Sequence, residues 1–140
     1  MSLKSAMFAN ASTYAPLIAL LGVSPFRWYD TRLEQGSPLP AVTVQTISEP
    51  SMNAVTGPLP TRWARVQFSI YGGGNDSTEA VTVAEALKTW AAQLDLTGQT
   101  GLLTYPALVV GDRDGGIPRT NPMTYMRIVD LRIFYDVTKV

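Results

Sequence analysis

The sequence predicts an α+β fold: a mostly antiparallel sheet of four to five strands packed by one long amphipathic helix, with two short N-terminal helices. Three observations support this prediction. Several segments alternate apolar and polar residues with a period of two, which is typical of strands with one buried face. One segment, Ala80 to Leu94, repeats apolar residues at helical spacing. The length of 140 residues, 46% of them hydrophobic and 16% charged, fits a single domain over residues 1–140.

The N-terminal segment predicts two short helices, Leu3 to Ala9 and Tyr14 to Leu21. Asn10, with the Ser and Thr that follow it, offers a stop and a new cap between them. Pro16 fits a first helical turn, where its missing N–H has no partner in any case. Gly22 then ends the second helix, and the apolar residues of both helices face a core.

Five segments after Gly22 predict strands. A short strand at 26–30 is followed by a turn-rich loop, and the longer strands are 41–49, 62–71 and 124–137. A further strand at 103–112 contains Pro106, which restricts it to an edge or to beginning there.

The two longest strands predict which face of the sheet is buried. One face carries Ala64, Val66, Phe68 and Ile70 together with Tyr125, Val129, Leu131, Ile133, Tyr135 and Val137. The opposite face carries Arg65, Gln67 and Ser69 together with Asp130, Arg132 and Asp136. We therefore expect one side on a core and one side much wetter. The core-facing helix contributes the stripe Val83, Leu87, Trp90 and Leu94.

The stretch "FSIYGGGNDSTEA" joins a strand to this helix through three glycines and raises the question of a bound phosphate. Gly72, Gly73 and Gly74 match neither the dinucleotide fingerprint nor the P-loop, and no Lys or Arg follows before Lys88. Asp76 as N-cap with Glu79 three residues later resembles a capping box, which would place carboxylates where an anion would bind. We expect a sharp turn and no nucleotide.

Side chains for most catalytic and metal-binding chemistry are missing. The sequence contains no cysteine and no histidine, which excludes thiol nucleophiles, thiolate ligands and the standard serine triad. The acidic cluster "DRDGG", Asp112 to Gly116, lacks the ligand series and closing glutamate of a calcium loop, so we expect a solvated turn. Serine–lysine catalysis could use only Lys4, Lys88 or Lys139, and none has a recognisable spacing. We expect no enzymatic activity, no cofactor and no metal.

Charge and hydropathy limit the partners. The formal net charge is zero, which argues against a broad electrostatic hold on nucleic acid or acidic lipid. The longest apolar run near the start, "APLIALLGV", has no basic leader and is too short to cross a bilayer. We expect no membrane partner, no specific nucleic-acid binding, and a chain that stays in the compartment where it is made.

Two predicted loops and several arginines are candidates for a protein–protein interface. The loops Glu49 to Thr61 and Asp112 to Pro122 are longer than hairpins require and contain apolar residues, which suit either local packing or a contact with another protein. Arginine on a polar sheet face is usually a solvated charge, but it is also enriched at interfaces. The candidate interface residues are Met52, Val55, Leu59, Arg62, Arg65, Arg113, Ile117, Arg119 and Arg132.

The order of segments resembles the tail-completion proteins, or tail terminators, of long-tailed bacteriophages. The matching features are two short helices, a brief strand ending in Trp28-Tyr29, and a Gln35-Gly36 turn leading through Pro40 into a Val-rich strand. The resemblance continues through "RWARVQFSIYGGGNDSTEAVTVAEALKTW" and closes with "RIVDLRIFYDV", similar to the family's final strand. The three glycines replace the family's usual strand exit, and the region 96–124 matches only loosely.

The resemblance implies a structural role in virion assembly. Such proteins form a ring, typically of six subunits, at the head-proximal end of the tail, stop tube polymerisation and join the capsid connector. The implied partners are copies of the chain itself, the tail tube protein and the head–tail connector protein, with DNA passing through the ring lumen. The implied location is the virion tail, after assembly in the host cytoplasm. The alternatives are another tail tube or connector subunit on a similar fold, or a small nucleotide-binding enzyme that uses the glycine turn.

Overall fold

The structure, a computed structural model, describes residues 3–23, 25–33, 36–48, 51–54, 57–74, 76–94, 96, 102–104, 107–120 and 123–137. At residues 51–54, 57–62, 102–104, 119–120 and 135–137 it describes only the backbone. The described residues form three helices and seven strands. In chain order these are α1 Leu3–Ala11, α2 Ala15–Leu21, β1 Trp28–Asp30, β2 Ala41–Ser48, β3 Ser51–Ala54, β4 Gly57–Gly72, α3 Thr78–Ala92, β5 Leu102–Thr104, β6 Leu108–Thr120 and β7 Met123–Val137.

The strands form one sheet built around the pair β4 and β7. Five strands follow one another in the order β1-β2-β4-β7-β5, while β3 pairs with β4 and β6 pairs with β7 outside this path. All pairs are antiparallel except β1 with β2. The β4–β7 ladder runs from Thr61 opposite Asp136 to Gly72 opposite Tyr125. The predicted α+β class is confirmed: a mostly antiparallel sheet, one helix of 15 residues and two short N-terminal helices.

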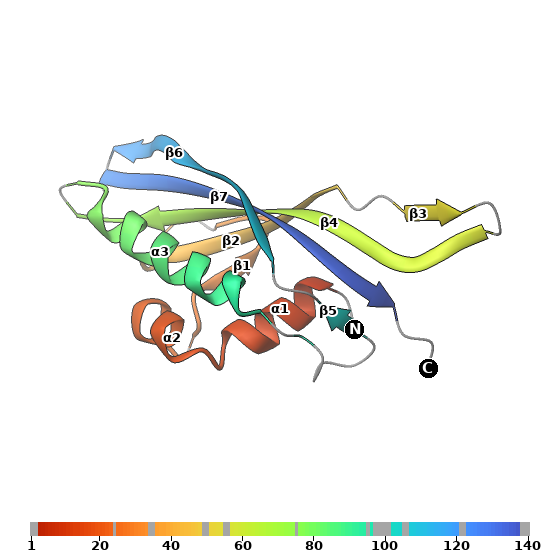
Figure 1. The fold of residues 1–140 in the computed structure, drawn as a ribbon. Helices are drawn as coiled ribbons and strands as arrows, with labels where there is room; N and C mark the ends of the chain where they lie inside the picture. The colour runs from red at the N-terminus through yellow and green to blue at the C-terminus, as the bar shows by residue number, and fades with distance from the viewer. Residues whose placement is uncertain are drawn as a thin grey trace.

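All three helices pack on one face of the sheet, which Figure 1 shows clearly. The face that they cover is the one predicted for β4 and β7, and its side chains from Ala64 to Ile70 and from Val129 to Ile133 are buried, whereas Tyr125 is only partly buried. The predicted helix stripe is buried against it through Val83, Leu87 and Trp90, with Leu94 just beyond the end of α3. Burying one large apolar side chain stabilises a fold by roughly 1.5–3 kcal/mol relative to exposure. The strand residues of this core cluster are Trp28, Val42, Val44, Ala64, Val66, Phe68, Ile70, Val129, Leu131 and Ile133.

The two N-terminal helices are fixed to this core at their ends. Asn10 near the end of α1 accepts a hydrogen bond from the indole N–H of Trp90 on α3, at 2.9 Å. Gly22 ends α2 with a φ of 87°, a conformation that glycine adopts without strain. The Arg27 guanidinium then donates to the carbonyls of Leu20 and Pro40, which joins the end of α2 to the start of β2. The predicted helix boundaries are confirmed to within two residues.

The segment Glu49 to Thr61, predicted as a loop, is mostly a β-hairpin. Ser51 lies opposite Arg62 and Ala54 lies opposite Gly57, so β3 pairs with the first part of β4. Proline has no N–H to donate to a neighbouring strand. It is tolerated in this part of β4 because the ladder with β7 begins only at Thr61, so one edge of the strand before Thr61 has no partner strand among the described residues. We call residues 51–54 and 57–62 the arm, and Figure 1 shows it projecting beyond the helices.

The segment Asp112 to Pro122, also predicted as a loop, forms most of strand β6 instead. The strand predicted at 103–112 is divided between β5 and the start of β6. Register shifts between Val109 and Gly111 and between Asp114 and Gly116 mark bulges in β6. A Cβ at Gly115 would collide with the Met126 side chain on β7, so the glycine lets the bulged strand approach its neighbour. The glycines and charged residues of this segment, which suggested a turn, therefore belong to a bulged strand.

Candidate assembly interface

The glycine-rich turn after β4 is filled by the protein's own carboxylates. The Gly73 N–H donates to Glu79 Oε1 and the Thr78 N–H donates to Asp76 Oδ1, both at 3.0 Å. Hydrogen bonds from the hydroxyl and the backbone N–H of Thr78 hold the pKa of Asp76 below its usual value. The expected capping box is wrong in detail, because the N-cap residue is Ser77 and its side chain makes no capping bond. The arrangement still places negative charge where a phosphate would bind.

Close packing, and not a ligand, explains the first of these glycines. A Cβ on Gly72 would lie 2.6 Å from the Ala80 backbone nitrogen, so the strand end and the helix start could not approach as they do. Gly74 has a φ of +98° with open space around it, which suits a sharp turn.

The acidic cluster Asp112 to Gly116 is not the solvated turn that we expected. Asp112 on β6 accepts hydrogen bonds from Lys88 of α3 at 2.6 Å and from Arg127 of β7 at 2.7 Å. Arg127 also donates to Asp114. The Arg127 hydrogen bond, and then that of Lys88, holds the pKa of Asp112 below its usual value, and the same contacts raise the pKa of Lys88 and Arg127. The cluster is therefore a structural network that fastens β6 to the helix side of the sheet.

On the sheet face away from the helices, here called the open face, three predicted interface arginines come together. Arg113 Nη1 lies 2.7 Å and Arg65 Nη2 lies 3.2 Å from Asp130 Oδ2. Arg132 stands directly opposite Arg65 in the β4–β7 ladder. Asp130 is only 1% exposed, so this part of the face is less wet than predicted. Since a buried charge needs a counter-charge, the two half-exposed arginines are required beside it.

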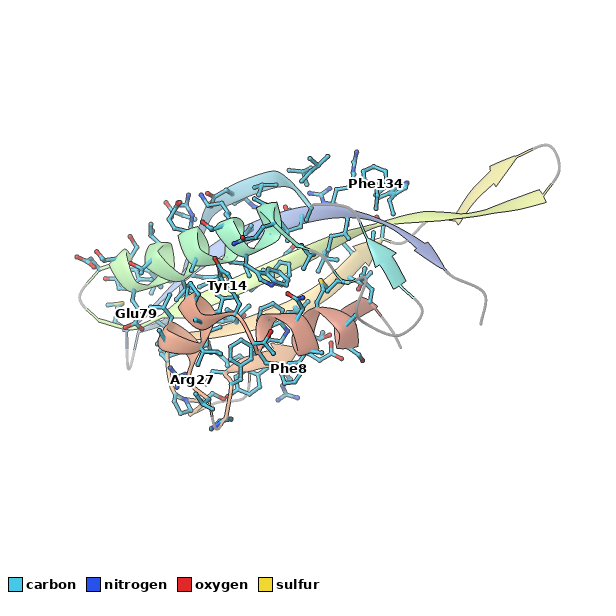
Figure 2. All side chains as sticks on the ribbon, turned by 60° about the horizontal axis from the view of Figure 1, so that its bottom comes forward. Phe8, Tyr14, Arg27, Glu79 and Phe134 are labelled. Carbon is cyan, nitrogen blue, oxygen red and sulfur yellow. The ribbon has the colours of Figure 1, made fainter. Side chains whose placement is uncertain are left out.

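Aromatic and apolar side chains border these arginines. The Arg132 guanidinium carbon lies 4.7 Å from the centre of the Trp63 ring, a cation–π contact. Phe134 stands opposite Trp63, and Figure 2 shows it on the other side of the sheet from Phe8 and Arg27. Leu108, 54% exposed, stands opposite Arg132. We call this group the arginine–aromatic surface: Trp63, Arg65, Leu108, Arg113, Arg132 and Phe134.

The structure places the other predicted interface residues at two ends of the molecule. Met52, Leu59 and Arg62 belong to the arm, where only the backbone is described, and Val55 lies outside the described residues. Ile117 is 50% exposed near the end of β6, and the backbone of Arg119 follows it on the same strand. These residues are therefore not parts of one continuous site.

The sequence analysis did not predict that three apolar residues of β6 are exposed. Leu108, Val109 and Val110 are consecutive, apolar and between 43% and 54% exposed. Their signal was present as an apolar run in a predicted edge strand, but the bulge that exposes all three was not visible. Trp63 and Phe134 were missed as neighbours of the arginines, because their proximity depends on the β4–β7 register.

Two surface grooves accompany these features. One, of about 250 Å³, lies between α1 and the β1 edge and is lined by Lys4, Ser5, Phe8, Trp28, Asp30 and Val44. The other, of about 240 Å³, lies at the start of α3 beside β6 and β7. Among the residues that the structure describes, no three metal-binding side chains gather at one point. None of the described helices has the length and apolarity needed to cross a membrane.

Fold and surfaces together define a small α+β domain with a helix-covered face and an open, arginine-rich face. No protein-family model matches the sequence, and no curated protein matches it. The fold is similar to that of a solved chain in the "Virion of native gene transfer agent (GTA) particle", with a TM-score of 0.72 and 18% sequence identity. The match covers 97% of this chain and 94% of that chain, so the two share a fold from end to end.

Proposed function

We propose that this chain is a structural protein of a phage-like virion and that it acts as a tail terminator. Copies of the chain close a ring, six by the family resemblance, that caps the tail tube and forms the head–tail joining surface. The observation that carries the proposal is the near full-length fold match to a chain of a gene transfer agent virion. The resemblance of the sequence to tail-completion proteins independently points to the same class.

Features of the molecule support a role in assembly. The arm projects beyond the helices, and neither face of its two strands is covered by a described helix (Figure 1). An extended hairpin of this kind is suited to reach a neighbouring protein, so we assign its contact to the tube or the connector. The candidate interface residues on the body, Arg65, Arg113, Ile117 and Arg132, then serve contacts between subunits. A head-to-tail contact between different surfaces closes a ring when its rotation allows.

A tube protein or a connector subunit on a similar fold is the nearest alternative. Electron microscopy of the purified protein separates them: closed rings of one size support the terminator, whereas long tubes support a tube protein. Native mass spectrometry gives the number of subunits in the ring. The nucleotide-binding alternative predicts that ATP, GTP or NAD raises the melting temperature as ligand concentration rises. Asp76 and Glu79 at the helix start argue against that result.

The arm provides the test of tail function in infected cells. We expect removal of Ser51 to Gly57 to give tails of abnormal length that fail to join heads. The purified variant should keep its helix content and cooperative unfolding, because the core lies on the other part of β4. The matched control is Asn53→Ala, a single substitution that leaves the length of the arm unchanged. Normal tails and normal head joining without the arm would contradict the role assigned to it.

A further inference from the structure

The charges of the chain are divided between two places on the molecule. Among the side chains that the structure describes, the arginine–aromatic surface brings Arg65 and Arg113 to the carboxylate of Asp130 and places Arg132 opposite Arg65. At the other end of β7, Asp76 and Glu79 lie at the start of α3, and Asp114 on β6 is 76% exposed although it pairs with Arg127 at 2.7 Å.

The acidic end carries a groove suited to a cationic, partly apolar side chain. Its volume is about 240 Å³. Ile117, which is 50% exposed, Tyr125 and Met126 provide an apolar lining, while Asp114 provides negative charge at the rim. Arginine and tryptophan combine a large flat apolar area with a polar end, which such a groove accommodates. We call it the acidic groove, lined by Ser77, Asp114, Gly116, Ile117, Tyr125 and Met126.

The two surfaces face opposite sides of the sheet, since Arg113 pairs with Asp130 on the open face whereas the next residue of β6, Asp114, pairs with Arg127 on the helix side. Most of their residues are also far apart along the strands. Tyr125 and Phe134 lie nine residues apart on β7, about 30 Å along a strand. A contact that joins them must therefore link two molecules, and it uses different surfaces on each. Such a contact is heterologous and can close a ring.

We propose that the arginine–aromatic surface of one copy docks on the acidic groove of the next copy of this chain. The side chains of Arg65 and Arg113 are 45% and 51% exposed, so their guanidinium groups remain available to a second carboxylate. Opposite charge on the two surfaces sets the direction and register of association. The inference deepens the proposed ring by naming the surfaces that meet in it.

Charge reversal in purified protein tests the contact. Arg132→Glu removes a cation from one surface, and Asp114→Arg removes a carboxylate from the other. Each alone should weaken self-association about tenfold or more, as measured by analytical ultracentrifugation, because close interfacial charge pairs are coupled at least this strongly. Both changes in one chain should restore association. The matched controls are Arg32→Glu and Asp30→Arg, which make the same changes at exposed positions elsewhere; circular dichroism checks folding of every variant.

Mixing the two single variants gives a sharper result. In an equal mixture the two intact surfaces meet each other and so do the two reversed surfaces, so the mixture should form rings in which the two variants alternate. Unchanged association of both single variants, equal weakening by the controls, or a mixture that associates no better than the single variants would overturn the inference while leaving a ring intact. A wild type that stays monomeric at about 1 mM would also overturn it, and tail length would still test the proposed function. Loss of duplex-DNA binding in Arg132→Glu with unchanged self-association would assign the surface to nucleic acid instead.

Discussion

The two faces of β4 and β7 are made by alternating residues of the same strands, yet they differ in what covers them. On the helix face, Phe68 and Leu131 are fully buried beneath Trp90 and its neighbours. The buried side chains of the open face include the polar Thr43, Ser69 and Asp130, and the Asp130 carboxylate is covered by arginines that are themselves half exposed. One face is closed by the chain's own helices, and the other by flexible cations.

This difference separates stability from assembly. Apolar burial dominates the free energy of folding, so the helix face holds most of it. Ion pairs with exposed partners contribute little stability, so the open face can change with small effect on the fold. Substitutions on the two faces should therefore differ in which measurement they alter.

The largest effect is expected on the helix face. Phe68→Ala should lower the free energy of unfolding by about 3–5 kcal/mol, because it removes a fully buried ring and leaves a cavity between the sheet and Trp90. Urea unfolding followed by circular dichroism measures this change. Gln67→Ala, the adjacent residue on the open face, is the control and should stay within about 0.5 kcal/mol. Equal losses for the two variants would remove the distinction between the faces.

The next largest loss of stability is expected at Gly72 and Gly74, where β4 ends and the chain turns towards α3. Gly72→Ala should cost about 1–3 kcal/mol, because the added Cβ would meet the Ala80 backbone and force β4 away from α3. Gly74→Ala meets no neighbouring atom and should cost about 1 kcal/mol, through its positive φ alone. Thermal unfolding of both variants checks the order, and a milder effect at Gly72 would show that the strand–helix approach is less tight than described.

Regular periodicity made the helix-face elements predictable. Alternation fixed the buried sides of β4 and β7, and the spacing of Val83, Leu87 and Trp90 fixed α3. The arm and β6 escaped prediction because prolines, glycines and charges interrupt their alternation. Those residues are tolerated there because one side of the arm pairs with no strand, and because β6 lies outside the central ladder and contains three register shifts.

The candidate interface was predictable only as a set of residue types. Arg65 and Arg132 were chosen as arginines on a polar strand face and Arg113 as part of a predicted loop, without knowledge that they meet. Their grouping depends on the register that places Gln67 and Gly111 opposite Asp130. Register is a long-range property, so the burial of Asp130 and the nearby Trp63 could not be read from local sequence.

A smaller effect is expected from the open face. Asp130→Asn removes two ion pairs whose arginines are half exposed, so the free energy of unfolding should fall by about 1–2 kcal/mol. The same variant frees Arg65 and Arg113 and makes the surface more basic, so its self-association should become more salt-dependent. Sedimentation at low and high salt measures this, with Asp30→Asn as the control. A loss as large as that of Phe68→Ala would show that the open face also holds the fold together.

The smallest effect is expected on the helix side of β6, in the network that fastens this strand to α3. Arg127 and Lys88 hold the pKa of Asp112 below its ordinary value of 3.8, so the ionised carboxylate stabilises the folded state. That stability is fully present above pH 3.8 and is lost as pH falls through the lower, folded-state pKa. The contribution of Lys88 depends on pH in the opposite direction, because its pKa is raised in the folded state. It stabilises the fold fully below pH 10.5, the ordinary pKa of lysine, and this stability is lost as the pH rises through the higher, folded-state pKa.

The free energy of unfolding of wild type and Asp112→Asn, measured against pH, tests this network. The difference between them should be constant near neutral pH and shrink in acid, and 1 M salt should reduce it because these groups are partly exposed. Thr89→Ala, a substitution at the exposed neighbour of Lys88 on α3, should keep the wild-type pH profile. If the Asp112→Asn difference did not change between pH 6 and pH 2.5, the carboxylate would not stabilise the fold through its charge. Strand β6 would then be held by its backbone ladder to β7 and would be no more dependent on charge than the helix face.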